Sequence, residues 1–160
     1  MLRAANRFPE AIEAAQTAVA LDPNQAYGYS AMGRAEPSIG RCEQAIVHTK
    51  QAFALSPRDP LSGVWHQDLG VAEFCLGRPE AATAEFKRAI DAGFRTYVPY
   101  AFLAAAESAK GNGAEAKLAV AEARRLNPQL TIKWFLEHGP VPQLPTIVLD
   151  GLRTAGLPEE

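Results

Sequence analysis

Residues 77–90, GRPEAATAEFKRAI, decide the fold, because closely similar stretches occur before and after them. The related stretches are NRFPEAIEAAQTAV from Asn6, GRCEQAIVHTKQAF from Gly40 and GNGAEAKLAVAEAR from Gly111. Aligning the four stretches superimposes Ala11, Ala45, Ala82 and Ala116, at separations of 34, 37 and 34 residues. A period of this length accommodates two short helices and two turns. The sequence therefore predicts an all-α solenoid of antiparallel helix pairs.

The first helix of each predicted pair carries four spaced positions that lie on one helical face. They are Tyr29, Met32, Gly33 and Glu36, then His66, Leu69, Gly70 and Glu73, then Tyr100, Leu103, Ala104 and Glu107. The small third residue should allow close approach of the second helix, where Ala45 faces Gly33. We interpret His66, which stands at an aromatic position, as a core residue.

From about Phe8 to Asn127 the chain resembles a tetratricopeptide repeat (TPR) array, because these positions follow the W-x2-L-G-x2-Y rhythm of that family. The resemblance implies a TPR-type α-solenoid over residues 1–138. We divide it into a half repeat at 1–23, repeats at about 26–59, 63–96 and 97–130, and a capping helix at 131–138. Residues 139–160 then form an extended Pro-rich tail that ends in a short helix at about 146–154.

Three irregular positions predict local changes in this pattern. Pro37, near the end of a first helix, should end or kink that helix. Three extra residues explain the 37-residue interval. Asp59 should act as the N-cap of the next helix and Pro60 as its first residue. The insert should then lengthen this helix by about one turn. In the sequence DAGF, Gly93 should adopt a left-handed C-cap conformation.

The N-terminal unit contains only the second helix of a pair, at about Pro9 to Leu21. Its apolar side, formed by Ile12, Ala15 and Val19, packs forward and lacks a partner behind it. We therefore expect either that this chain is the C-terminal part of a longer protein or that it forms a homo-oligomer through the exposed half repeat.

The composition argues against several classes of partner. The chain has 160 residues, of which 48% are hydrophobic, and a formal charge of −2 from 16 Lys and Arg against 18 Asp and Glu. The two signs are interspersed, so no basic stripe is offered to a nucleic acid. No apolar run approaches the roughly 18 residues of a membrane span, and no signal peptide is evident. We expect a cytoplasmic protein with neither nucleic acid nor membrane as a partner.

No residue pattern indicates catalysis, a cofactor or a metal. Cys42 and Cys75 belong to no CxxC pair, which predicts two reduced, partly buried thiols. The three histidines, His48, His66 and His138, are too scattered for a metal site or a general base. Nucleophile elbows, phosphate loops and metal motifs are absent from the sequence. We therefore expect no catalytic, cofactor-binding or metal-binding residues, and not an enzyme.

The candidate partner-binding surface is the concave face, which the first helices of the repeats form. Counting around these helices gives Tyr27, Ser30, Arg34, Val64, Gln67, Asp68, Val71, Val98, Ala101 and Phe102 as site residues. Chaperone-binding TPR proteins clamp a peptide carboxylate with Lys and Asn at such positions, and this chain has neither. A peptide, or the chain's own C-terminal tail, could lie along Val64, Val71, Val98 and Phe102. The alternative is that these apolar residues are only packed between helices.

The tail carries a second resemblance. TIKWFLEHGP from Thr131, followed by GLRTAGLPEE from Gly151, is similar to the C-terminus of some bacterial class III adenylate/guanylate cyclases with such repeats after the catalytic domain. That resemblance implies a regulatory or assembly role. No cyclase catalytic residue is present to be carried over. The sequence thus predicts a non-enzymatic interaction or regulatory scaffold, with the regulatory region of a nucleotide cyclase as the alternative.

Overall fold

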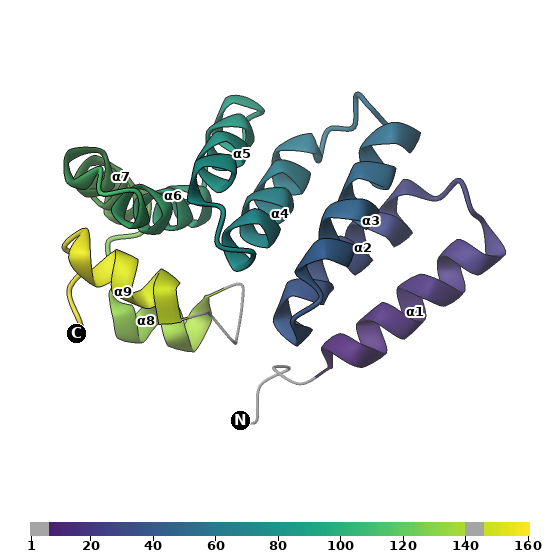
Figure 1. Ribbon diagram of the computed structural model, residues 1–160, viewed down its shortest axis with the longest axis horizontal. Helices are drawn as coiled ribbons and strands as arrows, with labels where there is room; N and C mark the ends of the chain where they lie inside the picture. The colour runs from purple at the N-terminus through teal and green to yellow at the C-terminus, as the bar shows by residue number, and fades with distance from the viewer. Residues whose placement is uncertain (1–6, 140–145) are drawn as a thin grey trace.

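The computed structural model describes residues 7–139 and 146–160, and the regular structure in these residues is entirely helical (Figure 1). The helices are α1 (Phe8–Leu21), α2 (Ala26–Ala35), the 3₁₀ helix η1 (Glu36–Ile39), α3 (Cys42–Leu55), α4 (Ser62–Cys75), α5 (Pro79–Asp91), α6 (Tyr97–Ala109), α7 (Gly113–Leu126), α8 (Ile132–His138) and α9 (Thr146–Thr154). From α1 to α7, each α-helix packs against the next one along the chain. The predicted all-α solenoid is therefore confirmed, whereas its division into numbered repeats stays a prediction.

Small residues set the spacing between paired helices. Ala45, Ala82 and Ala116 are fully buried. A Cβ atom added at Gly33 would lie 3.1 Å from the carbonyl oxygen of Ala45. At Gly70 an added Cβ would collide with the ring of Phe86, which is fully buried. The predicted close approach of the paired helices is thus confirmed.

The turn before α4 differs from the prediction. Helix α4 begins at Ser62 with Leu61 as its N-cap, eight residues before Gly70, whereas the first helix α2 begins at Ala26, seven residues before Gly33. Asp59 does not cap the helix, because its carboxylate accepts hydrogen bonds from the Leu61 N–H at 2.8 Å and from Ser56 Oγ at 3.0 Å. These bonds hold the chain in a turn that precedes the helix. The expected lengthening of α4 by one turn was therefore wrong, and the insert extends the turn.

Two other turn predictions are confirmed. Helix α2 ends at Ala35, and Pro37 lies in η1, where the helix tightens. Gly93 has a φ of 94°, and the Phe94 N–H donates to the Ala89 carbonyl at 3.0 Å. This pattern is a Schellman cap, in which the residue after the glycine turns back toward the helix. The cap brings Phe94 beside α4, since a Cβ added at Gly63 would lie 2.9 Å from Phe94 Cβ.

The C-terminal helices fold back beneath α6 and α7 (Figure 1). Helix α9 packs against α6, and a Cβ at Gly151 would lie only 2.8 Å from the Ala105 carbonyl oxygen. The last residues meet the start of α8, where the N–H groups of Ile132 and Lys133 donate to the carbonyls of Pro158 and Glu159 at 2.8 and 3.1 Å. These bonds satisfy N–H groups that a helix start otherwise leaves unpaired. The predicted Pro-rich connector at Pro140, Pro142 and Pro145 lies outside the described residues.

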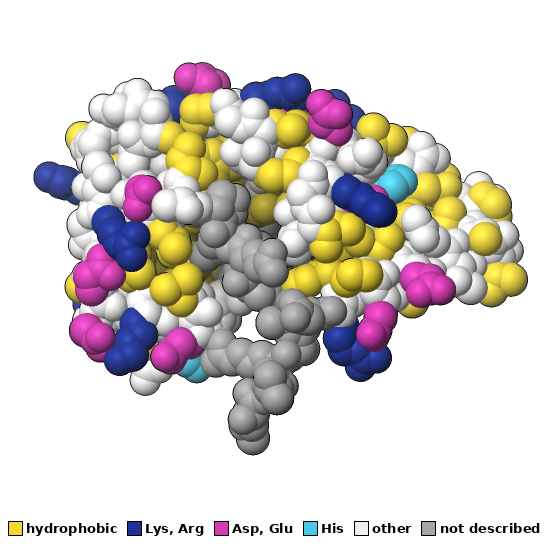
Figure 2. Space-filling view, turned by 60° about the horizontal axis from the view of Figure 1, so that its bottom comes forward, with side chains coloured by type: hydrophobic (Ala, Val, Ile, Leu, Met, Phe, Trp, Pro, Cys, Tyr) yellow, Lys and Arg dark blue, Asp and Glu magenta, His cyan; other side chains and the backbone are white. Residues whose placement is uncertain are grey.

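Figure 2 shows several patches of hydrophobic side chains on the face that carries α8 and α9. Lys, Arg, Asp and Glu side chains stand mainly around the margin of this face. None of the helices in the described residues is both long enough and apolar enough to cross a membrane.

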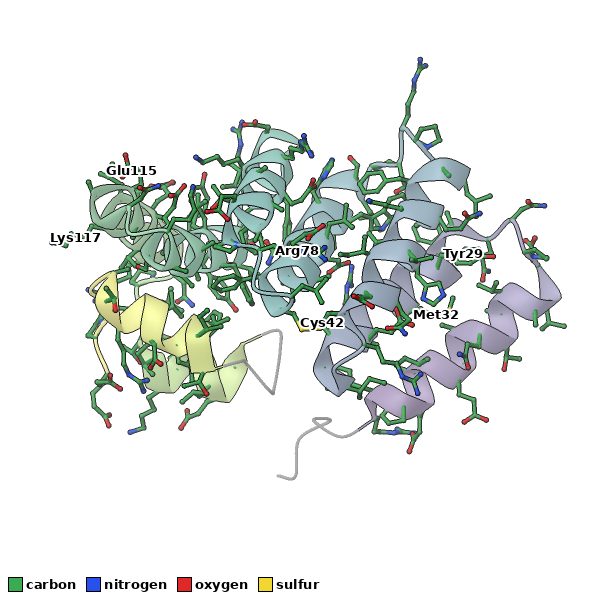
Figure 3. All side chains as sticks on the ribbon, viewed as in Figure 1. Tyr29, Met32, Cys42, Arg78, Glu115 and Lys117 are labelled. Atoms are coloured by element: carbon green, nitrogen blue, oxygen red, sulfur yellow. A yellow bond between two sulfur atoms is a disulfide. The ribbon has the colours of Figure 1, made fainter. Side chains whose placement is uncertain are left out.

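Cys42 and Cys75 are joined by a disulfide (Figure 3). Their Cα atoms are 6.2 Å apart, although 33 residues separate them in the chain. This separation is close to one repeat, so the stacking of neighbouring helix pairs brings the start of α3 beside the end of α4. The prediction of two reduced thiols was therefore wrong, because it considered sequence neighbours only.

Candidate partner-binding groove

A cavity of about 210 Å³ opens between the first helices of successive pairs. Its lining residues are Phe8, Arg34, Pro37, Val64, Gln67, Asp68, Val71, Phe94, Val98 and Phe102. We call this cavity the groove. Helix α4 supplies Val64, Gln67, Asp68 and Val71, which are spaced as i, i+3, i+4 and i+7 and therefore lie on one helical face. The groove is thus centred on α4.

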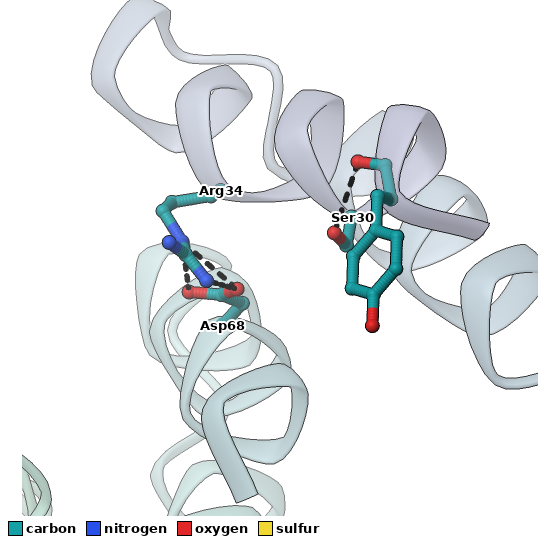
Figure 4. A network of polar contacts seen from close by, with 4 residues as sticks. Ser30, Arg34 and Asp68 are labelled. Atoms are coloured by element: carbon teal, nitrogen blue, oxygen red, sulfur yellow. Dashed lines mark hydrogen bonds and ion pairs between the residues drawn. The ribbon is translucent and has the colours of Figure 1, made fainter. Parts of the chain in front are cut away.

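Most of the predicted site residues line the groove, but three do not. Tyr27, Ser30 and Ala101 are absent from its lining. Ala101 is fully buried, while Ser30 Oγ donates to the Tyr27 carbonyl at 3.1 Å (Figure 4). The counting placed Ala101 on the concave face, but the solenoid packs this residue into the core.

Tyr27 lies apart from the groove and makes a polar contact of its own. Its side chain is exposed, and its hydroxyl donates to Asp59 Oδ1 at 3.5 Å. The negative charge of Asp59 raises the pKa of Tyr27, with burial and this hydrogen bond adding to the effect. Its ring stands edge-on to Trp65, with centroids 6.3 Å apart.

Sequence reasoning missed Phe8, Pro37 and Phe94 as lining residues. Phe8 and Phe94 lie outside the first helices of the predicted repeats, so counting around those helices could not find them. Pro37 was considered only as the residue that ends such a helix. A signal for Phe94 was available, because a hydrophobic residue directly after a C-cap glycine commonly packs back onto the structure. The other two lie at a helix start and in a 3₁₀ turn.

One ion pair stands in the wall of the groove (Figure 4). Arg34 Nε and Nη2 each donate to Asp68 Oδ2 at 3.2 Å, and Nε lies 3.4 Å from Oδ1. Arg34 is exposed, while Asp68 is buried. Burial raises the pKa of Asp68 to about 6, although the Arg34 charge and hydrogen bonds act in the opposite direction. The pair joins α2 to α4, which belong to successive helix pairs.

Gln67 has unused hydrogen-bonding capacity beside this pair. Its side chain is 5% exposed, yet neither Oε1 nor Nε2 has a hydrogen-bond partner among the described residues. A buried amide without partners costs free energy, and an amide both donates and accepts. A peptide group has the matching acceptor and donor. Gln67 can therefore offer a polar contact inside a lining that is apolar apart from the Arg34–Asp68 pair.

The lining of the groove is mainly apolar. Its apolar lining residues are Phe8, Pro37, Val64, Val71, Phe94, Val98 and Phe102. Within residues 7–139 and 146–160, no three His, Cys, Asp or Glu side chains are close enough together to hold a metal ion. The volume is smaller than the roughly 300 Å³ at which small-molecule pockets begin. It suits a single inserted side chain better than a cofactor.

Comparison with known proteins relates the chain to solved structures only. No protein-family model matches the sequence, and neither does any curated protein. Two crystal structures of MamA match with TM-scores of 0.67 and 0.66 at 22% and 23% identity, each covering 92% of this chain and 86% and 80% of the MamA chains. TTC0263, a thermophilic TPR protein of Thermus thermophilus, matches with a TM-score of 0.65 at 26% identity, over 76% of this chain and 66% of its own. The chain therefore has the fold of a TPR-type α-solenoid.

Proposed function

We propose that this chain is a non-enzymatic interaction scaffold that binds a segment of a protein partner in the groove. The observation that carries the proposal is Gln67, whose amide is buried and unpartnered among the described residues while it lines an apolar cavity. Buried polar groups in proteins nearly always have partners. An extended peptide would supply a hydrogen-bond partner to the Gln67 amide and an apolar side chain that packs against the valines of the groove.

The charges of the groove favour a neutral segment. The Arg34 guanidinium and the Asp68 carboxylate neutralise each other inside the lining. A charged side chain would have to displace this pair or be buried without a counterion, and both are costly. We therefore propose that the inserted residue is uncharged and apolar. In this proposal the scaffold works in the cytoplasm and binds neither nucleic acid nor membrane.

A random-peptide display selection on the immobilised chain tests the groove. Peptides selected on the natural chain should lose most of their binding to Val71→Arg, because a long charged side chain would fill the cavity. The matched control is Val47→Arg, since Val47 is a 64% exposed valine of α3 that does not line the groove. Unchanged binding to Val71→Arg, or equal loss in both variants, would contradict the proposal.

Two self-contacts belong to the same proposal. Helix α9 packs against α6, whose Val98 and Phe102 line the groove, so the chain's own tail is a candidate occupant of its far end. In helix α1 the predicted apolar residues Ile12 and Ala15 are buried within the chain itself. The residues that α1 leaves exposed for a homo-oligomer through this half repeat are Ala11, Ala14 and Leu21. Sedimentation of the natural chain and of Leu21→Glu tests the homo-oligomer. Oligomers that persist in Leu21→Glu would argue against the α1 contact.

The regulatory region of a nucleotide cyclase remains the second proposal. It is supported by the tail, because the residues that carry the cyclase resemblance include the buried Ile132, Phe135, Leu152 and Leu157, which belong to one core cluster. The tail is thus an integral part of the fold. Sequencing the coding region upstream of Met1 tests this proposal, and a reading frame without a cyclase domain would remove it.

A further inference from the structure

We propose that the Cys42–Cys75 disulfide is a reducible clamp on the groove, opened when a small thiol attacks the sulfur of Cys75. The two cysteine residues differ in exposure. Cys42 is 3% exposed, whereas Cys75 is partly exposed. An approaching thiolate therefore reaches Cys75 first.

The position of Cys42 favours its role as the leaving group. It is the first residue of the 14-residue helix α3. The N–H groups of a helix start and the helix dipole stabilise a thiolate there. Cys75 is the last residue of α4, where the same dipole disfavours a negative charge. Both helix ends thus direct the attack to Cys75 and the departing charge to Cys42.

The exchange balances with a thiol as the only reactant. The attacking thiolate forms a bond to Cys75 Sγ, the Cys75–Cys42 bond breaks, and its electron pair leaves on Cys42 Sγ. A second thiolate then attacks the mixed disulfide at the sulfur of the small thiol. This step releases the Cys75 thiolate and the oxidised small thiol. The protein disulfide gains two electrons, and the two small thiols lose them.

The disulfide joins two walls of the groove. Cys75 follows Val71 by one helical turn on α4, and Val71 lines the groove. Cys42 follows η1 closely, and Pro37 of η1 also lines the groove. The bond therefore fixes the distance between η1 and the end of α4. When the disulfide is reduced, only non-covalent contacts hold η1 and the end of α4 together.

The consequence for binding rests on the proposed function. If a partner segment fits the clamped groove better than the open one, reduction lowers its affinity. By thermodynamic linkage, the partner then opposes reduction to the same extent. Each tenfold ratio of the two affinities corresponds to about 30 mV in the midpoint potential of the cysteine pair.

Mapping the first exchange step tests the direction of attack. The chain is first oxidised with glutathione disulfide, then exposed briefly to glutathione, quenched in acid, alkylated and analysed by peptide mass spectrometry. We expect glutathione on Cys75 and the alkyl group on Cys42. The same chain in denaturant should show no preference, since the helix ends are lost. Glutathione mainly on Cys42, or no disulfide after oxidation, would overturn the proposal.

Hydrogen exchange tests the clamp itself. On reduction of the natural chain with dithiothreitol, amides of η1 and of the last turn of α4 should exchange faster by about tenfold or more, while those of α7 should not change. The double variant Cys42→Ser/Cys75→Ser should match the reduced chain with or without dithiothreitol. Equal exchange at η1 in the oxidised and reduced chains would overturn the clamp.

Neither experiment uses a partner, so each separates the clamp from the proposed function. If the thiol-exchange and hydrogen-exchange results are as expected but the display selection yields no groove-dependent peptides, the clamp is supported and peptide binding in the groove is not. If the display selection succeeds but the exchange results are not as expected, the groove binds peptides and the disulfide does not control that binding.

Discussion

Asp68 is the residue whose environment differs most from that of an ordinary surface carboxylate. Its side chain is 9% exposed, and a 56% exposed arginine side chain is its ion-pair partner. Burial prevails over this partner and raises the pKa from its ordinary value of 3.8 to about 6. Between these two values the folded chain binds the proton more strongly than the unfolded chain. The contribution of Asp68 to the free energy of unfolding therefore falls as the pH rises through this window.

We expect Asp68→Asn to remove this pH dependence, because the amide does not titrate. In the natural chain the contribution of Asp68 to the free energy of unfolding should fall by about 3 kcal/mol between pH 3.8 and a pH above about 6. Urea unfolding at a series of pH values measures it. Asp150→Asn is the matched control, since the Asp150 side chain is 63% exposed, and it should keep the natural slope. A slope in Asp68→Asn equal to that of the natural chain would refute this assignment.

The carboxylate of Glu107 is buried, and both of its oxygens have polar partners. It is 1% exposed and accepts hydrogen bonds from Asn112 Nδ2 at 2.7 Å and Lys110 Nζ at 3.1 Å. Lys87 of α5 lies 3.3 Å from its other oxygen. Burial acts to raise the pKa of Glu107, but these donors prevail and lower it. The residue ties α6 to both of its neighbours.

Glu107→Ala should destabilise the chain by about 3 kcal/mol, because it leaves three donors without their acceptor. Denaturant unfolding at neutral pH gives the value. Glu122→Ala is the control, as Glu122 is paired with Arg125 near the surface of α7, and only a small change is expected. Equal effects of the two substitutions would mean that the Glu107 contacts contribute little.

At the scale of elements, the contact of α9 with α6 depends on one glycine. A Cβ at Gly151 would stand 2.8 Å from the Ala105 carbonyl oxygen and 2.9 Å from its Cα. Backbone atoms cannot yield as a flexible side chain can. The two helices reach this distance only because residue 151 has no side chain.

Gly151→Val should therefore weaken the docking of α9 by about 1 to 3 kcal/mol. Hydrogen exchange of residues 146–160 should become faster, while exchange in α2 and α3 stays unchanged. Gly113→Val is the matched control, because an added Cβ at Gly113 meets no atom within 4 Å. If α9 remains as protected in Gly151→Val as in the natural chain, the close approach does not determine its docking.

At the scale of the whole molecule, the disulfide adds a covalent link to a solenoid in which helices otherwise contact mainly their neighbours. It closes a loop across 33 residues between successive helix pairs. Such a link reduces the conformational entropy of the unfolded chain.

Reduction of the disulfide should lower the free energy of unfolding by about 3 to 4 kcal/mol, the value for a loop of this length. Parallel denaturant titrations with and without dithiothreitol measure the difference. The double variant Cys42→Ser/Cys75→Ser should be insensitive to dithiothreitol. Identical unfolding midpoints for the oxidised and reduced natural chain would show that the link is absent or has no effect on stability.

The sequence by itself determined the helices and their pairing. Helical faces repeat every three to four residues, so Gly33, Gly70 and the buried alanines could be placed on the contact between paired helices from spacing alone. Pro37 and Gly93 acted through their own backbone restrictions, which need no tertiary context. Arg34, Val64, Gln67, Asp68, Val71, Val98 and Phe102 could be placed on one side for the same reason.

Only the tertiary structure decided which residues from different helix pairs meet. It joined Cys42 of one pair to Cys75 of the next, and it brought Arg34 of α2 to Asp68 of α4. These contacts depend on the rotation between successive pairs, which accumulates along the solenoid and is not encoded in any single period. For the same reason, the sequence indicated that Gln67 faces the groove, but only the structure showed that its buried amide lacks a partner among the described residues.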